Sequence, residues 1–142
     1  MYNKLKISIC LCTYNGQDYL GEQLDSLHQQ SIEFDELIII DDQSSDQSVQ
    51  IIQEFSDQRY KLSINKQNLG PVQSFEKAIS LSSGDIIFLC DQDDIWLPNK
   101  VETMTKKLIQ DESLLCLSNC LIGENPSTQE KFFKTKPKLS YC

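Results

Sequence analysis

The chain has 142 residues, 39% of them hydrophobic and 24% charged, a size and composition typical of one soluble globular domain. Its formal net charge of -8 argues against a nucleic-acid-binding protein, because phosphate backbones require a basic surface. No run approaches the ~18–20 apolar residues of a membrane-spanning helix, and the apolar stretch near the N-terminus lacks a signal-peptide cleavage site. We therefore expect a cytoplasmic protein that binds no nucleic acid.

Segments typical of strands and of helices alternate along the chain. Runs of β-branched and apolar residues predict strands at residues 6–12, 36–41, 60–64, 85–90 and 114–118. The predicted helices are residues 17–30, a helix opened by a capping box of Ser44 and Gln47, a helix from Pro71 that stops at Gly84, and a helix from Pro98. Their side chains expected to face the core are Leu20, Leu24 and Leu27, then Val49, Ile52 and Phe55, then Val72, Phe75 and Ile79, and last Val101, Met104 and Leu108.

This alternation predicts an α/β sandwich, with helices on both faces of a mostly parallel sheet. We expect residues 1–122 to form this domain. After Ile122 a turn leads into a polar, lysine-rich remainder. Residues 123–142 are therefore predicted to be a polar tail that begins a missing part, so that the domain is truncated at its C-terminus.

Five of the six cysteines are predicted to be small reduced residues of the core, since free cysteine is among the most buried residue types, and the last, Cys142, is expected to be an exposed thiol. A disulfide framework is not expected in a chain of this size without a secretory signal. No CxxC pair is present and His28 is the only histidine, which argues against a zinc site. The cysteines stand at positions 10, 12, 90, 116, 120 and 142.

Polar residues follow three of the predicted strands at their carboxyl ends, where open α/β sheets bind ligands. They are Thr13, Tyr14 and Asn15 after the first strand, Asp41, Asp42, Ser44, Ser45 and Asp46 after the second, and Asp91, Asp93 and Asp94 after the fourth. We expect the six carboxylates among them to converge on one edge of the sheet. Taken alone, Asp42 and Ser44 are more typical of helix caps, and residues 13–16 of a turn.

The acidic run Asp91-Gln92-Asp93-Asp94 favours a metal site over a solvated turn. Like charges clustered beside a buried strand raise carboxylate pKa values, which is unfavourable unless a cation neutralises them. Carboxylate oxygens without nearby His or Cys favour Mg²⁺ or Mn²⁺. Such an ion would bridge the acidic protein to a diphosphate and neutralise charge on a leaving group.

Other phosphate-binding arrangements are disfavoured. The chain has neither the GxxxxGK[ST] loop of P-loop ATPases nor the GxGxxG turn of nicotinamide dehydrogenases. A nucleotidyltransferase would share the layout and the acidic loop, but residues 13–16 lack the basic side chains that a triphosphate needs. A diphosphate held by a metal ion remains the favoured ligand.

Four segments together resemble the N-terminal domain of the family 2 glycosyltransferases, over about residues 5–122. They are ISICLCTYNG (7–16), IIIDDQSSD (38–46), Asn68-Leu69-Gly70 and GDIIFLCDQDDIWLP (84–98). The resemblance implies a GT-A fold, an inverting mechanism and a nucleotide-diphosphate sugar donor. Gln92 and the Ile95-Trp96 pair are similar to residues of bacterial cell-surface polysaccharide transferases, including rhamnosyltransferases.

The resemblance also implies roles for single residues. Asp42 would accept a hydrogen bond from the uracil or thymine ring, and Asp93 would bind the metal. Trp96 would either pack under the metal loop or contact the sugar. The residues implied in nucleotide binding are Cys12, Thr13 and Tyr14 at the base and ribose, Asn15, Asp41 as support for its loop, Asp42, Asn68, Gly70, Asp91 near the ribose or a metal-bound water, and Gln92. The implied metal ligands are Asp93 and Asp91, for Mn²⁺ or Mg²⁺.

The expected function is inverting transfer of a sugar from a UDP- or dTDP-sugar to a glycan or lipid-linked acceptor. The catalytic general base is not identified, and we expect it beyond Cys142, with the missing acceptor-binding part. The alternative is a non-catalytic module that binds nucleotide sugars without that base. A full-length enzyme of this kind would work in the cytoplasm or associate peripherally with the inner face of the cell membrane.

Overall fold

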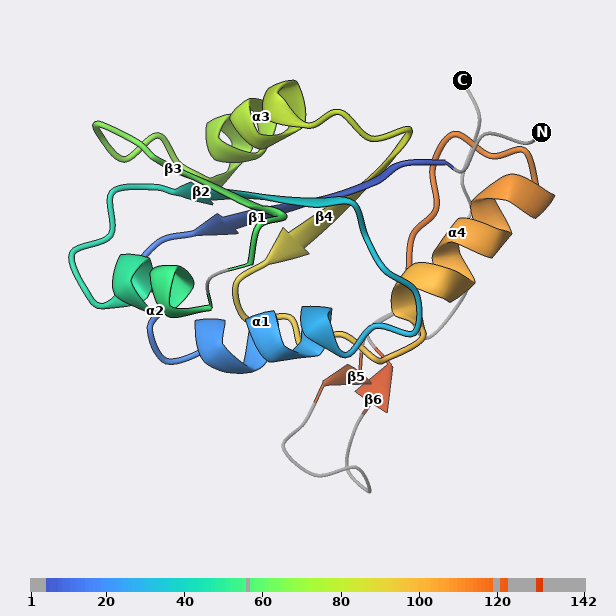
Figure 1. Ribbon diagram of the computed structural model, residues 1–142, viewed down its shortest axis with the longest axis horizontal. Helices are drawn as coiled ribbons and strands as arrows, with labels where there is room; N and C mark the ends of the chain where they lie inside the picture. Colours follow the sequence, from blue (N-terminus) through green and yellow to red (C-terminus); the bar gives the residue numbers. More distant parts are fainter. Residues whose placement is uncertain (1–4, 56, 119–120, 123–129, 132–142) are drawn as a thin grey trace. The chain divides into compact units, whose positions relative to one another are not determined.

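The computed structural model describes residues 5–55, 57–118, 121–122 and 130–131, and Figure 1 shows the arrangement of its elements. The chain divides into two compact units, residues 1–105 and residues 106–142. The second unit holds a short antiparallel pair, β5 (Leu121–Ile122) and β6 (Glu130–Lys131). The predicted domain boundary after residue 122 borders residues outside the described ranges and stays a prediction. Within those ranges, no helix combines the length and the hydropathy needed to cross a membrane.

The first unit is built around a sheet with the strand order β3-β2-β1-β4, in which every pairing is parallel. Its strands are β1 (Ile7–Thr13), β2 (Glu36–Asp41), β3 (Tyr60–Ile64) and β4 (Ile86–Asp91). The helices in the described ranges are α1 (Leu20–His28), α2 (Ser48–Glu54), α3 (Pro71–Leu81) and α4 (Lys100–Gln110). Helices α1 and α2 cover one face of the sheet and α3 covers the other (Figure 1), which confirms the predicted α/β fold.

The core lies on both faces of β1 and β2, and every residue of these two strands is buried. On the face of α1 and α2, Ile9 and Ile39 belong to one hydrophobic cluster with Leu24. On the face of α3, Cys10 belongs to a second cluster with Ala78. Full burial of a Leu or Ile side chain stabilises a fold by about 1.5–3 kcal/mol. The two central strands therefore form a stable base for the loops at their ends.

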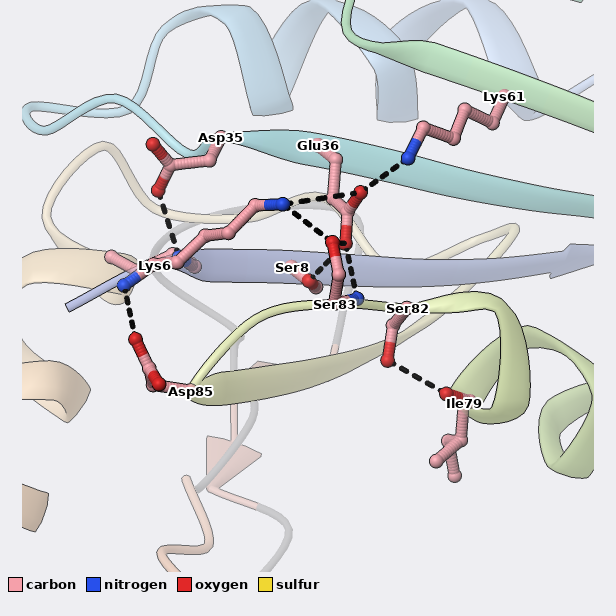
Figure 2. Close-up of polar contacts among 10 residues, drawn as sticks. Lys6, Ser8, Asp35, Glu36, Lys61, Ile79, Ser82, Ser83 and Asp85 are labelled. Carbon is pink, nitrogen blue, oxygen red and sulfur yellow. Dashed lines mark hydrogen bonds and ion pairs between the residues drawn. The ribbon is translucent and has the colours of Figure 1, made fainter.

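A buried carboxylate, Glu36, joins the amino ends of the strands (Figure 2). Its Oε1 accepts hydrogen bonds from Ser8 Oγ of β1 (2.7 Å) and from Ser83 N (2.5 Å), and its Oε2 accepts one from Lys61 Nζ of β3 (2.6 Å). Burial disfavours the charged form of Glu36, but the hydrogen bonds from Lys61, Ser8 and Ser83 lower its pKa to about 2. A Cβ at Gly84 would lie 2.4 Å from Ser8 Oγ, so the approach of the chain to β1 requires glycine there.

The limits of the elements differ from the predicted ones by a few residues. β2 and β3 have the predicted limits, whereas β1 and β4 each lie one residue later. Helix α1 begins at Leu20 and not at Gln17, because residues 17–19 form a turn. Helix α3 ends at Leu81 and not at Gly84, which lies instead on the way into β4.

The predicted capping box at Ser44 and Gln47 is wrong. Helix α2 begins at Ser48, and Gln47 makes no side-chain cap in the described structure. Asp46 Oδ1 accepts a hydrogen bond from Ser48 N (3.0 Å) in its place. Ser44 Oγ accepts one from Asn15 N of the preceding loop (2.9 Å). The Ser44 hydroxyl, which was predicted to cap the helix, therefore connects the loop after β1 to the loop after β2.

Of the predicted core face of α3, Phe75 does pack against the core, but Val72 and Ile79 do not. Val72 is 80% exposed and Ile79 is 42% exposed, while Ser74 and Ala78 are buried. Ser74 Oγ accepts a hydrogen bond from Asn65 Nδ2 (3.2 Å) in the loop after β3. This polar contact and the small Ala78 side chain turn a different face of the helix toward the sheet from the one that hydrophobicity alone indicates.

Residues 114–118 form no strand, contrary to the prediction. Their leucines Leu114, Leu115 and Leu117 are 105%, 60% and 53% exposed. A strand requires a neighbouring backbone that pairs with it, and none of the pairings in the described part of the chain includes these residues. An apolar run cannot by itself predict whether such a neighbour exists.

The cysteines of the main sheet are free and buried, as predicted: Cys10, Cys12 and Cys90. Burial raises the pKa of Cys10 to about 11 and that of Cys12 to about 12. These thiols therefore stay protonated at neutral pH and act as small apolar residues. Cys116 is free and half-buried. Cys120, predicted for the core, and Cys142, expected as an exposed thiol, lie outside the described residues.

Candidate functional site

Parallel pairing brings the carboxyl ends of β1, β2 and β4 to one edge of the sheet. Thr13 at the end of β1 is in register with Asp41 of β2, and Cys12 is in register with Asp91 of β4. This is the edge at which open α/β sheets bind ligands. The residues predicted to form the site follow these three strands, so the structure brings their loops together.

In the first loop, only Tyr14 has an exposed side chain among the three residues expected at the base and ribose. Tyr14 is 48% exposed, whereas Cys12 and Thr13 are 6% and 3% exposed. Cys12 lies in the cluster between the sheet and α3, and the Thr13 hydroxyl donates a hydrogen bond to Gln92 Oε1 (2.7 Å). Tyr14 is therefore the side chain of this group that is placed to contact a ligand.

Asn15 and its neighbours fasten the first loop to the second. Asn15 Oδ1 accepts a hydrogen bond from Ser45 N (2.9 Å), and Asp46 Oδ2 accepts one from Gln17 N (3.1 Å). Asn15 has a φ of 48°, a left-handed conformation that asparagine tolerates better than most residues. The amide oxygen of Asn15 is thus engaged within the protein, and its predicted role in nucleotide binding stays a prediction.

The two adjacent aspartates at the end of β2 have different surroundings. Asp41 is fully buried, and its Oδ2 accepts a hydrogen bond from Ser44 N (3.0 Å). Its Oδ1 has no hydrogen-bond partner in the part of the chain that the structure describes. Asp41 therefore lies under the second loop, where a residue that supports this loop is expected.

Asp42 holds the loop that connects β3 to α3. Its Oδ1 accepts hydrogen bonds from Asn65 Nδ2 (2.7 Å) and Leu69 N (2.8 Å), and its Oδ2 accepts one from Gly70 N (2.8 Å). Burial disfavours the charged form of Asp42, but these donors lower its pKa. Asn68 joins the group, because its Nδ2 donates to Asp42 O (3.3 Å). Asp42 is 4% exposed, and its predicted contact with the base stays a prediction.

The acidic loop after β4 presents the carboxylates of Asp91, Asp93 and Asp94 to solvent. Burial and then the negative charges of Asp93 and Asp94 raise the pKa of Asp91, against a hydrogen bond from the Gln92 backbone that lowers it. The predicted direction is confirmed, although burial is the larger cause. Among the described residues, neither Asp93 nor Asp94 accepts a side-chain hydrogen bond or forms an ion pair, and no three potential ligands lie together in a metal-binding group.

The far end of the acidic loop is fastened to α1. Trp96 is 3% exposed and its ring lies 5.8 Å from that of Phe88, which favours its packing role over a sugar contact. Trp96 N donates a hydrogen bond to Ser26 Oγ (3.1 Å). The side chain of Gln30 donates to Leu97 O (2.9 Å) and accepts from the N–H of Val101 (3.0 Å).

Several residues that shape this edge were not predicted from the sequence. Gln43 has a left-handed φ of 66° and bonds through its side chain to Lys66 O (3.2 Å) and Asn68 N (3.1 Å). Gln23 and Ser26 are buried on α1 among leucines. Polar residues on an otherwise apolar helix face are the signal that would have indicated these contacts, since buried polar groups need partners.

Comparisons with known proteins agree on one family. The family model for glycosyl transferase family 2 matches residues 8–138. The glucosyltransferase WfgD of Escherichia coli, named as UDP-Glc:alpha-D-GlcNAc-diphosphoundecaprenol beta-1,3-glucosyltransferase, is 31% identical over 135 residues. The match covers 95% of this chain and 53% of WfgD, so the chain spans about half the length of this relative.

Two solved structures share the fold. TarS of S. aureus, in complex with UDP-GlcNAc, has a TM-score of 0.71 and 26% identity, over 76% of this chain and 32% of TarS. The mannosyltransferase PcManGT of Pyrobaculum calidifontis, solved with GDP-Man and Mn²⁺, has a TM-score of 0.70 and 20% identity, over 75% of this chain and 33% of that chain. At this identity the second likeness extends to the fold alone.

Proposed function

Because this chain belongs to glycosyl transferase family 2 and has a GT-A type of fold, we propose that it binds a UDP- or dTDP-sugar through a divalent metal ion. The whole protein would transfer the sugar with inversion to a glycan or lipid-linked acceptor. The observation that carries this proposal is the arrangement at the carboxyl edge of the sheet. There, the carboxylates of Asp93 and Asp94 accept no hydrogen bond from the described residues, while those of Asp42 and Asp46 are engaged.

The nucleotide would bind across the first and second loops. Tyr14 offers an exposed aromatic ring for stacking, and Asp42 is the proposed acceptor for a ring N–H of uracil or thymine. The UDP-GlcNAc complex of TarS and the UDP-Glc donor in the name of WfgD support a uridine nucleotide. Asn68 and Gly70 contact Asp42 and so would set the position of the base indirectly.

The acidic loop fits Mg²⁺ or Mn²⁺. Asp91, Asp93 and Asp94 supply hard oxygen donors, and Mg²⁺ ordinarily takes only one or two protein carboxylates together with water and substrate phosphates. The lack of a three-ligand group among the described residues agrees with a site that a diphosphate completes. When bound, the metal would neutralise negative charge on the diphosphate leaving group. The chain would contribute Asp93 and Asp91 as ligands.

The acceptor and the general base belong to the proposal for the whole protein. The lipid-linked acceptor in the name of WfgD supports an acceptor of that kind, and with it an association with the cytoplasmic face of a membrane. An inverting transfer needs a base near the acceptor oxygen. We assign none of the described residues to that role, so a module that binds the donor without transferring its sugar is the second candidate.

Calorimetry with UDP and dTDP, with and without Mn²⁺, tests the proposal. We expect Mn²⁺-dependent binding, weakened at least about ten-fold by Asp93→Ala, since even outer-shell changes at metal sites cost roughly 10–100-fold in affinity. Glu76→Ala is the matched control, because it removes one exposed carboxylate from α3. UDP binding that Mn²⁺ does not strengthen, or that Asp93→Ala leaves unchanged, would contradict the proposal. Release of UDP from a UDP-sugar in the presence of an acceptor would support the transferase, and donor binding without such turnover would support the binding module.

A further inference from the structure

The side chain of Gln92 crosses from the acidic loop to the first loop. Its Oε1 accepts hydrogen bonds from Thr13 Oγ1 (2.7 Å) and from Tyr14 N (2.9 Å), and its Nε2 donates to Tyr14 O (3.4 Å). Backbone pairing between β1 and β4 ends with Cys12 and Asp91. Beyond that point the amide of Gln92 bonds both backbone groups of Tyr14, as a paired strand would. It therefore extends the connection between the two loops after the strands have ended.

Gly16 leaves the space that this crossing needs. A Cβ on Gly16 would lie 2.4 Å from Gln92 Oε1 and 2.8 Å from Thr13 Oγ1. Of the described glycines only Gly70 has a positive φ, so backbone conformation does not explain Gly16. The space beside Gly16 is filled instead by the amide of Gln92 and the hydroxyl of Thr13, which are hydrogen-bonded to each other. The sequences of both loops are thus adapted to the same contact.

The contact of Gln92 with Thr13 and Tyr14 joins the acidic loop, which is proposed to bind the metal, to the first loop, which is proposed to bind the nucleotide. Asp91 and Asp93, on either side of Gln92, are the proposed metal ligands, and Tyr14 is the proposed contact to the nucleotide. The amide of Gln92 has little capacity left for a ligand, because both acceptor positions of Oε1 and one of the two Nε2 hydrogens are engaged. This occupancy favours a role within the protein over the nucleotide contact expected from the sequence.

We propose that Gln92 is a positioning residue that couples the nucleotide-binding loop to the metal-binding loop, an inference that rests on the proposed function. Through this amide, ordering of the first loop by a nucleotide fixes the backbone between Asp91 and Asp93. Binding of UDP therefore strengthens binding of the metal beyond the direct contribution of the diphosphate. By reciprocity, the metal strengthens binding of UDP by the same factor.

The test measures Mn²⁺ affinity by electron paramagnetic resonance with and without UDP, and UDP affinity by calorimetry without metal. In Gln92→Ala and in Gly16→Ala we expect the UDP-dependent gain in Mn²⁺ affinity to fall about five-fold or more, as the loss of one or two hydrogen bonds predicts. Affinity for UDP alone should change by less than about two-fold, since Gln92 makes no ligand contact. Gly21→Ala is the matched control, because a Cβ there would meet nothing within 4 Å.

A double variant, Gly16→Ala with Gln92→Ala, shows whether both changes act through one contact. We expect the UDP-dependent gain in Mn²⁺ affinity of the double variant to equal that of either single variant. Its midpoint of thermal unfolding should exceed that of Gly16→Ala, because the new Cβ no longer clashes with Gln92. The coupling would be overturned if Gln92→Ala left the UDP-dependent gain in Mn²⁺ affinity unchanged, or if it abolished UDP binding without metal. Additive effects of the two substitutions in the double variant would also overturn it. Absence of Mn²⁺-dependent UDP binding in the unsubstituted chain would instead overturn the proposed function, whatever the unfolding data show.

Discussion

At the scale of single residues, the aspartates of the site divide into those that hold the protein together and those that remain for a ligand. Asp42 accepts three hydrogen bonds from the loop that leads into α3. Asp93 accepts none from the described residues. Both residues are aspartates that follow a buried strand, so the sequence does not distinguish them. Their surroundings do: substitution of Asp42 should affect stability, and substitution of Asp93 should affect metal binding.

Substitution of Asp42 should therefore destabilise the fold. In Asp42→Asn the new amide nitrogen would face the N–H of Gly70 or the donors from Asn65 and Leu69, so that at least one buried donor loses its acceptor. We expect the free energy of unfolding in urea to fall by about 1–3 kcal/mol. Asp18→Asn, at an exposed position of the first loop, should change it by less than about 0.5 kcal/mol. Equal stability of the two variants would show that Asp42 does not hold the loop.

The sequence predicted these residues as a group more successfully than it predicted their contacts. An acidic pair after a buried strand and the run Asp91-Gln92-Asp93-Asp94 were sufficient to locate the edge of the sheet. The partners of Asp42 lie more than twenty positions away, at Asn65, Leu69 and Gly70. Local patterns contain no information about such contacts. The family resemblance placed Gln92 at the nucleotide, whereas its amide is bonded to Thr13 and Tyr14 of the first loop.

At the scale of elements, strands were easier to predict than the helix faces that cover them. β2 has four consecutive apolar residues between Glu36 and Asp41 and is buried throughout, and the predicted limits of this strand are confirmed. Helix α3 shows why faces are harder, because Ser74 is buried through a bond with Asn65 while Val72 lies in solvent. Residues 114–118 have the composition of a strand but no pairing partner in the described structure. The buried face of α3 depends on a polar contact with a distant segment, and strand formation at residues 114–118 would depend on pairing with one.

Glu36 and its partners Ser8, Lys61 and Ser83, here called the Glu36 cluster, predict how stability depends on pH. The pKa of the Glu36 carboxyl lies at about 2 in the folded protein, below the ordinary value of 4.5. A carboxyl group whose pKa is lowered by folding stabilises the protein above its unfolded pKa, and this contribution is lost as the pH falls. We expect Glu36 to contribute roughly 2–3 kcal/mol at neutral pH, and to lose this between about pH 4.5 and pH 2.

Urea unfolding of the unsubstituted chain and of Glu36→Gln across this pH range measures that contribution. The difference in unfolding free energy between the two should be largest near neutral pH and should shrink as the pH falls toward 2. Glu76→Gln, which changes an exposed glutamate of α3, should show no comparable trend. A pH-independent difference for Glu36→Gln would mean that the charge of Glu36 does not stabilise the strand ends.

At the scale of the whole molecule, the acidic character of the chain and its proposed anionic ligand are reconciled by a metal ion. A protein of net charge -8 repels a diphosphate unless a cation lies between them. The sheet directs its carboxyl ends to one edge, and the Glu36 cluster fastens the opposite ends of the strands. The hydrogen bonds of Glu36 and the proposed binding site thus lie at opposite ends of the same strands.

The most direct test of this account is the position at which Mn²⁺ binds, read from paramagnetic broadening of amide resonances in the labelled chain. With UDP present, substoichiometric Mn²⁺ should broaden the resonances of Asp93, Asp94 and Tyr14 first. The resonances of Lys61 and Ser83, at the Glu36 cluster, should stay sharp. Broadening that is centred elsewhere, or that is unaffected by UDP, would contradict a metal-bridged nucleotide at the carboxyl edge of the sheet.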